Sequence, residues 1–219
     1  LWQCSSNMPI WAEASKTARD EKVTEDEILA EFRASDALLE GHFILSSGRH
    51  GAQYLQCARL LMNPARAARV AAALADKLPG NIRRSIDIVV SPAMGGVIIG
   101  HEMGRALGLD ALFLERPEGT FELRRGFRLQ PGQKVLMMED VVTTGLSSRE
   151  AIQAIQDAGG DVIAAGALID RSNGAAQFDV PFFPLLTLDV PSYAADELPP
   201  ELAAIPAIKP GSRTETPAG

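Results

Sequence analysis

Residues 135–148 read VLMMEDVVTTGLSS, and this stretch decides the fold. Its first four apolar residues predict a buried strand of a parallel sheet. The strand runs directly into Glu139 and Asp140, and then into a loop of Thr, Gly and Ser residues that opens a helix. Such a loop presents backbone N–H groups and hydroxyls at a helix N-terminus, where anions bind. Because the two acids can accept hydrogen bonds from a sugar diol, the stretch predicts a ligand with both hydroxyls and a phosphate.

Strands and helices alternate on both sides of this stretch. Apolar runs predict strands at 86–90, 111–114, 162–169 and within 182–190, and helices are expected at 97–107 and 148–158. A polar loop with a hairpin is expected at 115–128. Strands alternating with helices imply a parallel sheet covered on both faces. The sequence therefore predicts an α/β fold with a smaller N-terminal part.

The N-terminal part begins with a clear helix signal. Thr24 and Glu27 have the spacing of a capping box, and the apolar periodicity that follows predicts a helix up to Leu39, ended by Gly41. Two apolar segments, 43–45 and 53–57, predict a hairpin around a polar loop. Asn63-Pro64 then predicts the start of a second helix that reaches Leu78.

These patterns predict one domain with two loose ends. We expect residues 1–22 to be a flexible segment and residues 23–205 to form the domain, with its N-terminal helix and hood in 23–62. Residues 206–219 are rich in Pro, Gly, Ser and Thr and are expected to form a disordered tail.

Composition excludes several classes of protein. The 219 residues carry 21 basic and 28 acidic side chains, so the net charge of −7 argues against binding nucleic acid through nonspecific phosphate attraction. The two cysteines are not in a CxxC pair, and Cys57 is expected to be a small buried side chain. No run of about 18 apolar residues occurs. We expect a cytoplasmic protein without a nucleic-acid or membrane partner.

Residues 135–148 resemble the phosphoribosyl-pyrophosphate (PRPP) signature of the type I phosphoribosyltransferases. That signature consists of apolar residues, two acids, two apolar residues and T-T-G-x-S, and the stretch fills nearly every position. The resemblance implies the type I phosphoribosyltransferase fold, a central, mostly parallel sheet flanked by helices with a small N-terminal hood. It also implies that Glu139 and Asp140 hold the ribose hydroxyls of PRPP. The 5′-phosphate is expected to bind Thr144, Gly145, Leu146 and Ser147, mostly through backbone N–H groups.

A second segment matches the family in the expected place. Its members carry a loop of small residues that contacts pyrophosphate after an earlier strand, and SPAMGG at 91–96 follows a predicted strand and precedes a helix. Two glycines at a helix start often only permit tight packing. In combination with the PRPP signature, the resemblance implies that Ala93, Met94, Gly95 and Gly96 form the pyrophosphate loop.

Two further segments resemble the orotate phosphoribosyltransferases. Residues 41–49 have that family's aromatic residue, short strand and Ser-Gly turn, and IDRSNG at 169–174 resembles its strand-end Asp-Arg. A planar guanidinium can bind the orotate carboxylate through two hydrogen bonds. The resemblance, which covers residues 25–192, implies that Arg171, Thr143, Ser47 and Gly48 bind orotate. A surface arginine at a strand end is the alternative for Arg171.

The sequence departs from the orotate family at two places. Ser46 stands where many members have a lysine before the Ser-Gly turn. The loop at 115–128 has four arginines and neither lysine nor histidine, which is similar to a shorter, arginine-bearing subgroup. The resemblance implies that Arg116 reaches the pyrophosphate and that Arg124 or Arg125 closes over it as a lid. In the family this lid serves the neighbouring subunit, so a homodimer is implied. A solvated charged hairpin is the alternative for Arg124 and Arg125.

The resemblance implies a Mg²⁺-dependent reaction of pyrimidine biosynthesis. Ribose 5-phosphate would move from PRPP to orotate, giving orotidine 5′-monophosphate and pyrophosphate. Mg²⁺ is expected to be held mainly by PRPP and water, without a dedicated protein site.

Two other functions stay open. A purine phosphoribosyltransferase acting on xanthine or hypoxanthine would need base stacking and amide contacts rather than a carboxylate clamp. A regulator that senses PRPP and binds nucleic acid would need a basic face or a helix-turn-helix pattern, and residues 1–40 show no such pattern.

Overall fold

The computed structural model describes residues 23–45 and 47–210, which form a six-stranded and a three-stranded sheet. The large sheet has the strand order β5-β4-β3-β6-β7-β8. Its strands are β3 (Ile88–Pro92), β4 (Ala111–Glu115), β5 (Glu122–Leu123), β6 (Lys134–Val142), β7 (Asp161–Asp170) and β8 (Phe182–Thr187). All neighbouring pairs are parallel except β4 and β5, which form an antiparallel hairpin. The predicted mostly parallel sheet is therefore confirmed, and the hairpin expected at 115–128 begins earlier, because its first strand is β4.

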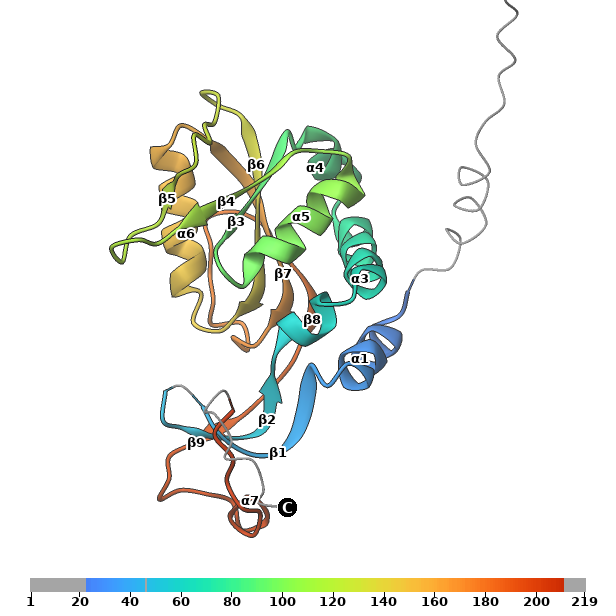
Figure 1. Cartoon of the computed structure of the whole chain (residues 1–219), viewed down its shortest axis with the longest axis vertical. Coiled ribbons are helices and arrows are strands. Elements are labelled where there is room, and N and C mark those ends of the chain that lie inside the picture. Colours follow the sequence, from blue (N-terminus) through green and yellow to red (C-terminus); the bar gives the residue numbers. More distant parts are fainter. Residues whose placement is uncertain (1–22, 46, 211–219) are drawn as a thin grey trace, which may run out of the picture.

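The large sheet is buried on both faces. Since successive side chains of a strand point to opposite sides, one strand contributes to both cores. Leu136 and Met138 of β6 join one apolar core, while Val135 and Met137 join the other. The first face packs against α1, α2, α3 and α5, and α6 covers the opposite face (Figure 1). The helices are α1 (Glu25–Ala34), α2 (Cys57–Leu61), α3 (Pro64–Lys77), α4 (Gly80–Ser85), α5 (Gly96–Leu107), α6 (Leu146–Asp157) and α7 (Pro200–Ala203).

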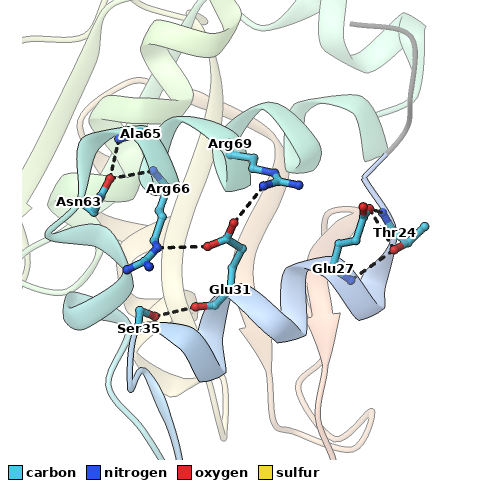
Figure 2. Close-up of polar contacts among 8 residues, drawn as sticks. All are labelled: Thr24, Glu27, Glu31, Ser35, Asn63, Ala65, Arg66 and Arg69. Carbon is cyan, nitrogen blue, oxygen red and sulfur yellow. Dashed lines mark hydrogen bonds and ion pairs between the residues drawn. The ribbon is translucent and has the colours of Figure 1, made fainter. Parts of the chain in front are cut away.

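Polar contacts fix α1 at its start and against α3 (Figure 2). The predicted capping box is present: the backbone N–H of Glu27 donates to Thr24 Oγ1 at 3.2 Å, and the backbone N–H of Thr24 donates to Glu27 Oε2 at 2.8 Å. Further along, Glu31 accepts hydrogen bonds from Arg66 at 3.1 Å and from Arg69 at 2.9 Å. These contacts align α1 with α3 along the sheet.

The N-terminal helix is shorter than its periodicity predicts. It ends at Ala34, and Asp36 has a φ of +51°, which turns the chain away from the helical path. Leu38 and Leu39 belong instead to β1 (Leu38–Ile44), where they pair with Leu55 and Tyr54 of β2. The expected helix up to Leu39 is therefore wrong at its end, because cross-strand pairing in the hood replaces the local helical pattern.

The second sheet forms the hood, in the order β1-β2-β9, with β2 at His50–Leu55 and β9 at Ser192–Tyr193. It lies beyond the carboxyl edge of the large sheet (Figure 1). Buried His42 connects the hood to the C-terminal segment, since its Nδ1 lies 2.8 Å from the carbonyl oxygen of Ile205 and its Nε2 lies 2.6 Å from Nδ1 of His50. The predicted hairpin is confirmed, except that Cys57 begins α2 rather than ending a strand.

The hood continues past the expected domain end at residue 205. The backbone N–H of Ile44 donates to the carbonyl of Ile208, and the N–H of Ile208 donates to the carbonyl of His42, both at 2.8 Å. The start of the expected tail, 206–208, is therefore attached to β1 because backbone groups there find partners.

The predictions for 1–22, Ser46 and 211–219 lie outside the described residues. Across the described ranges, no helix is both long and apolar enough to cross a membrane.

Candidate active site

The predicted site residues gather at the carboxyl edge of the large sheet, where the chain changes direction across the sheet. From β3 the chain continues to β4 on one side and later to β6 on the other side. Ligands of open α/β sheets bind at such a switch point, beyond the carboxyl ends of the strands. The loop after β3 and the loop after β6 are therefore neighbours at the position where a ligand is expected.

Two glycines allow these loops to approach closely. A Cβ on Gly95 would lie 2.7 Å from both carboxylate oxygens of Asp140, and a Cβ on Gly96 would lie 2.9 Å from the carbonyl oxygen of Met138. The same loop contains a cis peptide bond between Ala93 and Met94. The expected pyrophosphate loop thus lies directly against Asp140 of the acidic pair. This close approach explains why position 95 is a glycine.

The two acids differ in their environment. Glu139 is only 6% exposed. Burial, followed by the charge of neighbouring Asp140, raises the pKa of Glu139 to about 8. The backbone N–H of Asp140 donates to Glu139 Oε1 at 3.1 Å, and that of Val141 donates to Asp140 Oδ1 at 2.8 Å. Two adjacent carboxyls, one favouring its protonated form, can accept and donate hydrogen bonds to sugar hydroxyls.

The loop before α6 leads into a helix start that has the features expected of an anion site. Gly145 begins the helix with a φ of +73° and supplies no side chain to cap it, so the first turn has backbone N–H groups without an intrahelical partner. Thr144 Oγ1 accepts the N–H of Leu146 at 3.3 Å. A cavity of about 240 Å³ is lined by this loop. Its lining residues are Arg116, Glu150 and the whole stretch 141–148, which includes Thr143 and Ser147.

Arg116 brings a positive charge to the same cavity. Its guanidinium forms an ion pair with Glu150 of α6 and lies over the ring of Phe121, 4.0 Å from the ring centroid. These two contacts hold the side chain beside the loop before α6. Arg124 and Arg125 do not reach this cavity, since both form ion pairs with Glu115 at the end of β4.

Arg171 follows β7, the strand next to β6. Its backbone N–H donates to the carbonyl of Val142 at 2.8 Å, which ties it to the end of β6. The side-chain Nε is buried without a hydrogen-bond partner among the described residues. Burial also lowers the pKa of the Arg171 guanidinium below its ordinary value. A buried, unpaired donor on a cation is costly, so its position indicates a ligand that accepts its hydrogen bond.

Two predicted residues and a second, larger cavity lie apart from this cluster. Ser47 and Gly48 form the turn between β1 and β2, and therefore belong to the hood. A cavity of about 490 Å³ lies between the hairpin segment 119–123 and α6, and it contains none of the predicted site residues. The smaller cavity, by contrast, is lined by the predicted residues Thr143–Ser147 and Arg116.

Sequence reasoning did not single out three residues beside the site. Glu115 and Glu150 form ion pairs with the loop arginines. Burial, followed by the charges of Asp140 and Glu139, raises the pKa of the Cys57 thiol. Glu150 lies 34 residues from its partner Arg116, whereas Glu115 lies 9 and 10 residues from its partners in the same hairpin, and no local motif includes either acid. Only the buried character of Cys57 was predicted, and its 3% exposure confirms it.

The comparisons with known proteins agree with this geometry. Residues 56–189 match the family model described as the phosphoribosyl transferase domain, so the chain belongs to the phosphoribosyltransferases. Orotate phosphoribosyltransferase of Rhizorhabdus wittichii is 72% identical over 191 residues, which are 87% of this chain and 97% of that protein. The enzyme of the same name from Novosphingobium aromaticivorans is 73% identical, covering 87% and 98%. Within the phosphoribosyltransferases, the chain is a member of the orotate phosphoribosyltransferase family.

The fold comparison gives the same family. The crystal structure of orotate phosphoribosyltransferase from Aeropyrum pernix matches with a TM-score of 0.61 and 27% identity, covering 74% of this chain and 93% of that chain. The predicted type I phosphoribosyltransferase fold is therefore confirmed.

Proposed function

We propose that this chain transfers ribose 5-phosphate from PRPP to orotate, giving orotidine 5′-monophosphate and pyrophosphate for pyrimidine synthesis. The observation that carries the proposal is the clustering, at one sheet edge, of an acidic pair, an uncapped helix start and the unpaired Nε of Arg171. A sugar diol, a phosphate and a carboxylate are the three groups that such a cluster would bind together. PRPP and orotate supply these three groups.

The chain's residues would act mainly by positioning the two substrates. Displacement at an anomeric carbon develops oxocarbenium character, as in glycoside cleavage. Thr144, Gly145, Leu146 and Ser147 would fix the 5′-phosphate, and Glu139 and Asp140 would hold the ribose hydroxyls next to the reacting carbon. Holding both reactants in register lowers the entropic part of the barrier.

The remaining roles concern the leaving group and the base. Residues 93–96 and Arg116 would bind the leaving pyrophosphate, whose developing charge their donors would stabilise. Arg171 would bind the orotate carboxylate, with Thr143 facing the base. Ser47 and Gly48 would reach the base from the hood. Arg124 and Arg125 would cover the site and exclude water.

The acidic pair fits Mg²⁺, because its oxygen atoms are the ligands that this ion prefers. Among residues 23–45 and 47–210, no group of three or more His, Cys, Asp or Glu side chains is placed to hold a metal ion. Mg²⁺ would therefore be held mainly by PRPP oxygens and water, next to the acidic pair. Bound there, Mg²⁺ would neutralise negative charge on the pyrophosphate. A homodimer and a cytoplasmic location belong to the same proposal and rest on the resemblance.

The test is orotate consumption, followed by ultraviolet absorbance with PRPP and Mg²⁺, for the wild type, Arg171→Ala and Arg171→Lys. We expect Mg²⁺-dependent turnover by the wild type. Arg171→Ala should raise the KM for orotate about 10- to 100-fold, because a charge-assisted bond to a buried carboxylate is lost. Arg171→Lys should recover only part of this loss, since an ammonium cannot form the two parallel hydrogen bonds.

Arg33→Ala is the matched control, because Arg33 is half exposed on α1 and pairs with exposed Glu40. It should leave the KM for orotate unchanged. Turnover of xanthine or hypoxanthine instead of orotate would retain the PRPP site and reject the orotate assignment. The absence of turnover with every base would reject the enzymatic function.

A further inference from the structure

Arg149 of α6 contacts the backbone of the loop that is proposed to bind the 5′-phosphate of PRPP. Its Nη1 donates a hydrogen bond to the carbonyl oxygen of Thr144 at 3.2 Å. A Cβ on Gly145 would lie 3.0 Å from the same nitrogen. The guanidinium therefore lies against the peptide that joins Thr144 to Gly145, although Arg149 as a whole is an exposed residue.

The Arg149 side chain lies outside the cavity that this loop lines. Thr144 and Gly145 line the cavity of about 240 Å³, whereas Arg149 is not one of its lining residues. The same Cβ position on Gly145 would also lie 3.0 Å from the Cβ of Ala176 and 3.3 Å from Cε1 of Phe178, so the guanidinium belongs to a packed group behind the loop. Arg149 can therefore hold the loop without occupying the place of a ligand.

This contact sets the direction of the peptide between Thr144 and Gly145. In a trans peptide the carbonyl and the N–H point to opposite sides, so a carbonyl held by Arg149 directs the N–H of Gly145 away from the guanidinium. Within the part of the chain that the structure describes, this N–H donates to no backbone carbonyl. It is therefore free to bind an anion at the uncapped start of α6.

Glycine leaves the same peptide free to turn over. Gly145 has a φ of +73°, and a residue without a Cβ reaches negative φ values about as readily. Rotating the peptide by about 180°, as between the two common turn types, would exchange its two groups. The carbonyl oxygen of Thr144 would then face the cavity and repel a phosphate. The hydrogen bond from Arg149 therefore selects the orientation that binds an anion.

We propose that Arg149 is a positioning residue that keeps the N–H of Gly145 directed at the 5′-phosphate of PRPP. The inference rests on the proposed function and gives Arg149 no contact with the substrate. When only a fraction of the molecules has the competent loop, the apparent affinity falls by that fraction. Loss of Arg149 should therefore weaken ligands that carry the 5′-phosphate. It should spare pyrophosphate, which is expected at residues 93–96, and orotate.

The test compares Arg149→Ala with Arg105→Ala, which removes the same charge from an exposed position of α5. Titration calorimetry measures the dissociation constants of ribose 5-phosphate and of pyrophosphate with Mg²⁺, and turnover measures the KM for PRPP and for orotate. In Arg149→Ala we expect the dissociation constant of ribose 5-phosphate and the KM for PRPP to rise about three- to tenfold. The constants for pyrophosphate and orotate should stay at the wild-type values, and Arg105→Ala should change none of the four.

Salt dependence separates orientation of the loop from simple attraction between charges. Salt screens a charge that acts on the phosphate from a distance, whereas the loss of an orienting hydrogen bond should persist at high ionic strength. An unchanged dissociation constant of ribose 5-phosphate in Arg149→Ala would overturn the inference. Equal weakening of pyrophosphate, or an effect that vanishes at high salt, would also overturn it. A wild-type protein that neither binds ribose 5-phosphate nor turns over PRPP would reject the proposed function itself.

Discussion

At the scale of single residues, the environment of Glu139 decides its chemistry. Glu139 and Asp140 are neighbours in the chain, yet only Glu139 is fully enclosed by the sheet. Removing its carboxylate from water favours the protonated form, and the nearby charge of Asp140 adds to that preference. The folded protein therefore holds a proton on Glu139 at a pH where the unfolded chain has released it.

This difference predicts a pH-dependent effect of Glu139→Gln on stability. Because the pKa of Glu139 rises from 4.5 to about 8 on folding, the wild type loses free energy of unfolding as the pH rises through that window. Glutamine removes this loss. Without PRPP and Mg²⁺, the variant should be more stable at pH 8.5 by on the order of 5 kcal/mol, and the gain should shrink towards pH 5. Urea unfolding at several pH values measures it.

The exposed Glu118→Gln serves as the control and should show no such pH-dependent gain. An equal gain at pH 5 and pH 8.5 would contradict the role of burial. Activity should fall in Glu139→Gln in spite of its higher stability, because one proposed ribose ligand is altered.

At the scale of elements, the site depends on two loops that meet at the carboxyl edge. The loop after β3 and the acids of β6 come from separate elements, and their approach requires glycine at position 95. Gly95 itself has an ordinary helical conformation, with φ −60° and ψ −43°, so alanine would not strain its backbone. The cost of a side chain there comes only from the contact with Asp140.

Gly95→Ala should therefore damage activity more than stability. The added Cβ would meet both oxygens of Asp140 at 2.7 Å and displace the carboxylate. A catalytic-site group displaced by up to about one ångström positions substrate less well. We therefore expect displacement of the Asp140 carboxylate to lower kcat/KM about 10- to 100-fold. Gly80→Ala, whose Cβ meets only the flexible end of Arg84, should keep wild-type kinetics. Normal kinetics in Gly95→Ala would show that Asp140 is not needed at its present position.

At the scale of the whole molecule, the hood joins distant parts of the chain. It combines β1 and β2 from the N-terminal part with β9, α7 and the segment around Ile208 from the C-terminal part. This arrangement places the Ser47–Gly48 turn on a body separate from the large sheet. The stability of the hood therefore depends on residues that the sequence pattern assigns to a tail.

Two truncations test this dependence. A chain that ends at Ile205 loses both backbone hydrogen bonds of Ile208, whereas a chain that ends at residue 210 keeps them. We expect the shorter chain to be less stable by about 1–3 kcal/mol, since each bond contributes about 0.5–1.5 kcal/mol. Chemical denaturation of the two truncated chains measures the difference. Equal stability would show that the contact of Ile208 with β1 contributes nothing.

The sequence by itself determined the features that local chemistry controls. The apolar run into Glu139 and Asp140, the loop up to Ser147 and the cap of α1 each depend on residues within a few positions of one another. Their strand, acids and helix start could therefore be predicted, and so could the family and its mostly parallel sheet. The predicted roles of the site residues stay predictions until the variants are measured.

Tertiary structure alone decided what depends on contacts between distant segments. The helical periodicity up to Leu39 gave way to pairing with β2, because cross-strand contacts outweigh a weak local preference. The partners of the loop arginines, the attachment of Ile208 and the approach of Gly95 to Asp140 have no local signal in the chain. The last two join backbone groups or charges that are far apart in sequence, and the arginine–Glu115 pairs form only when the hairpin closes.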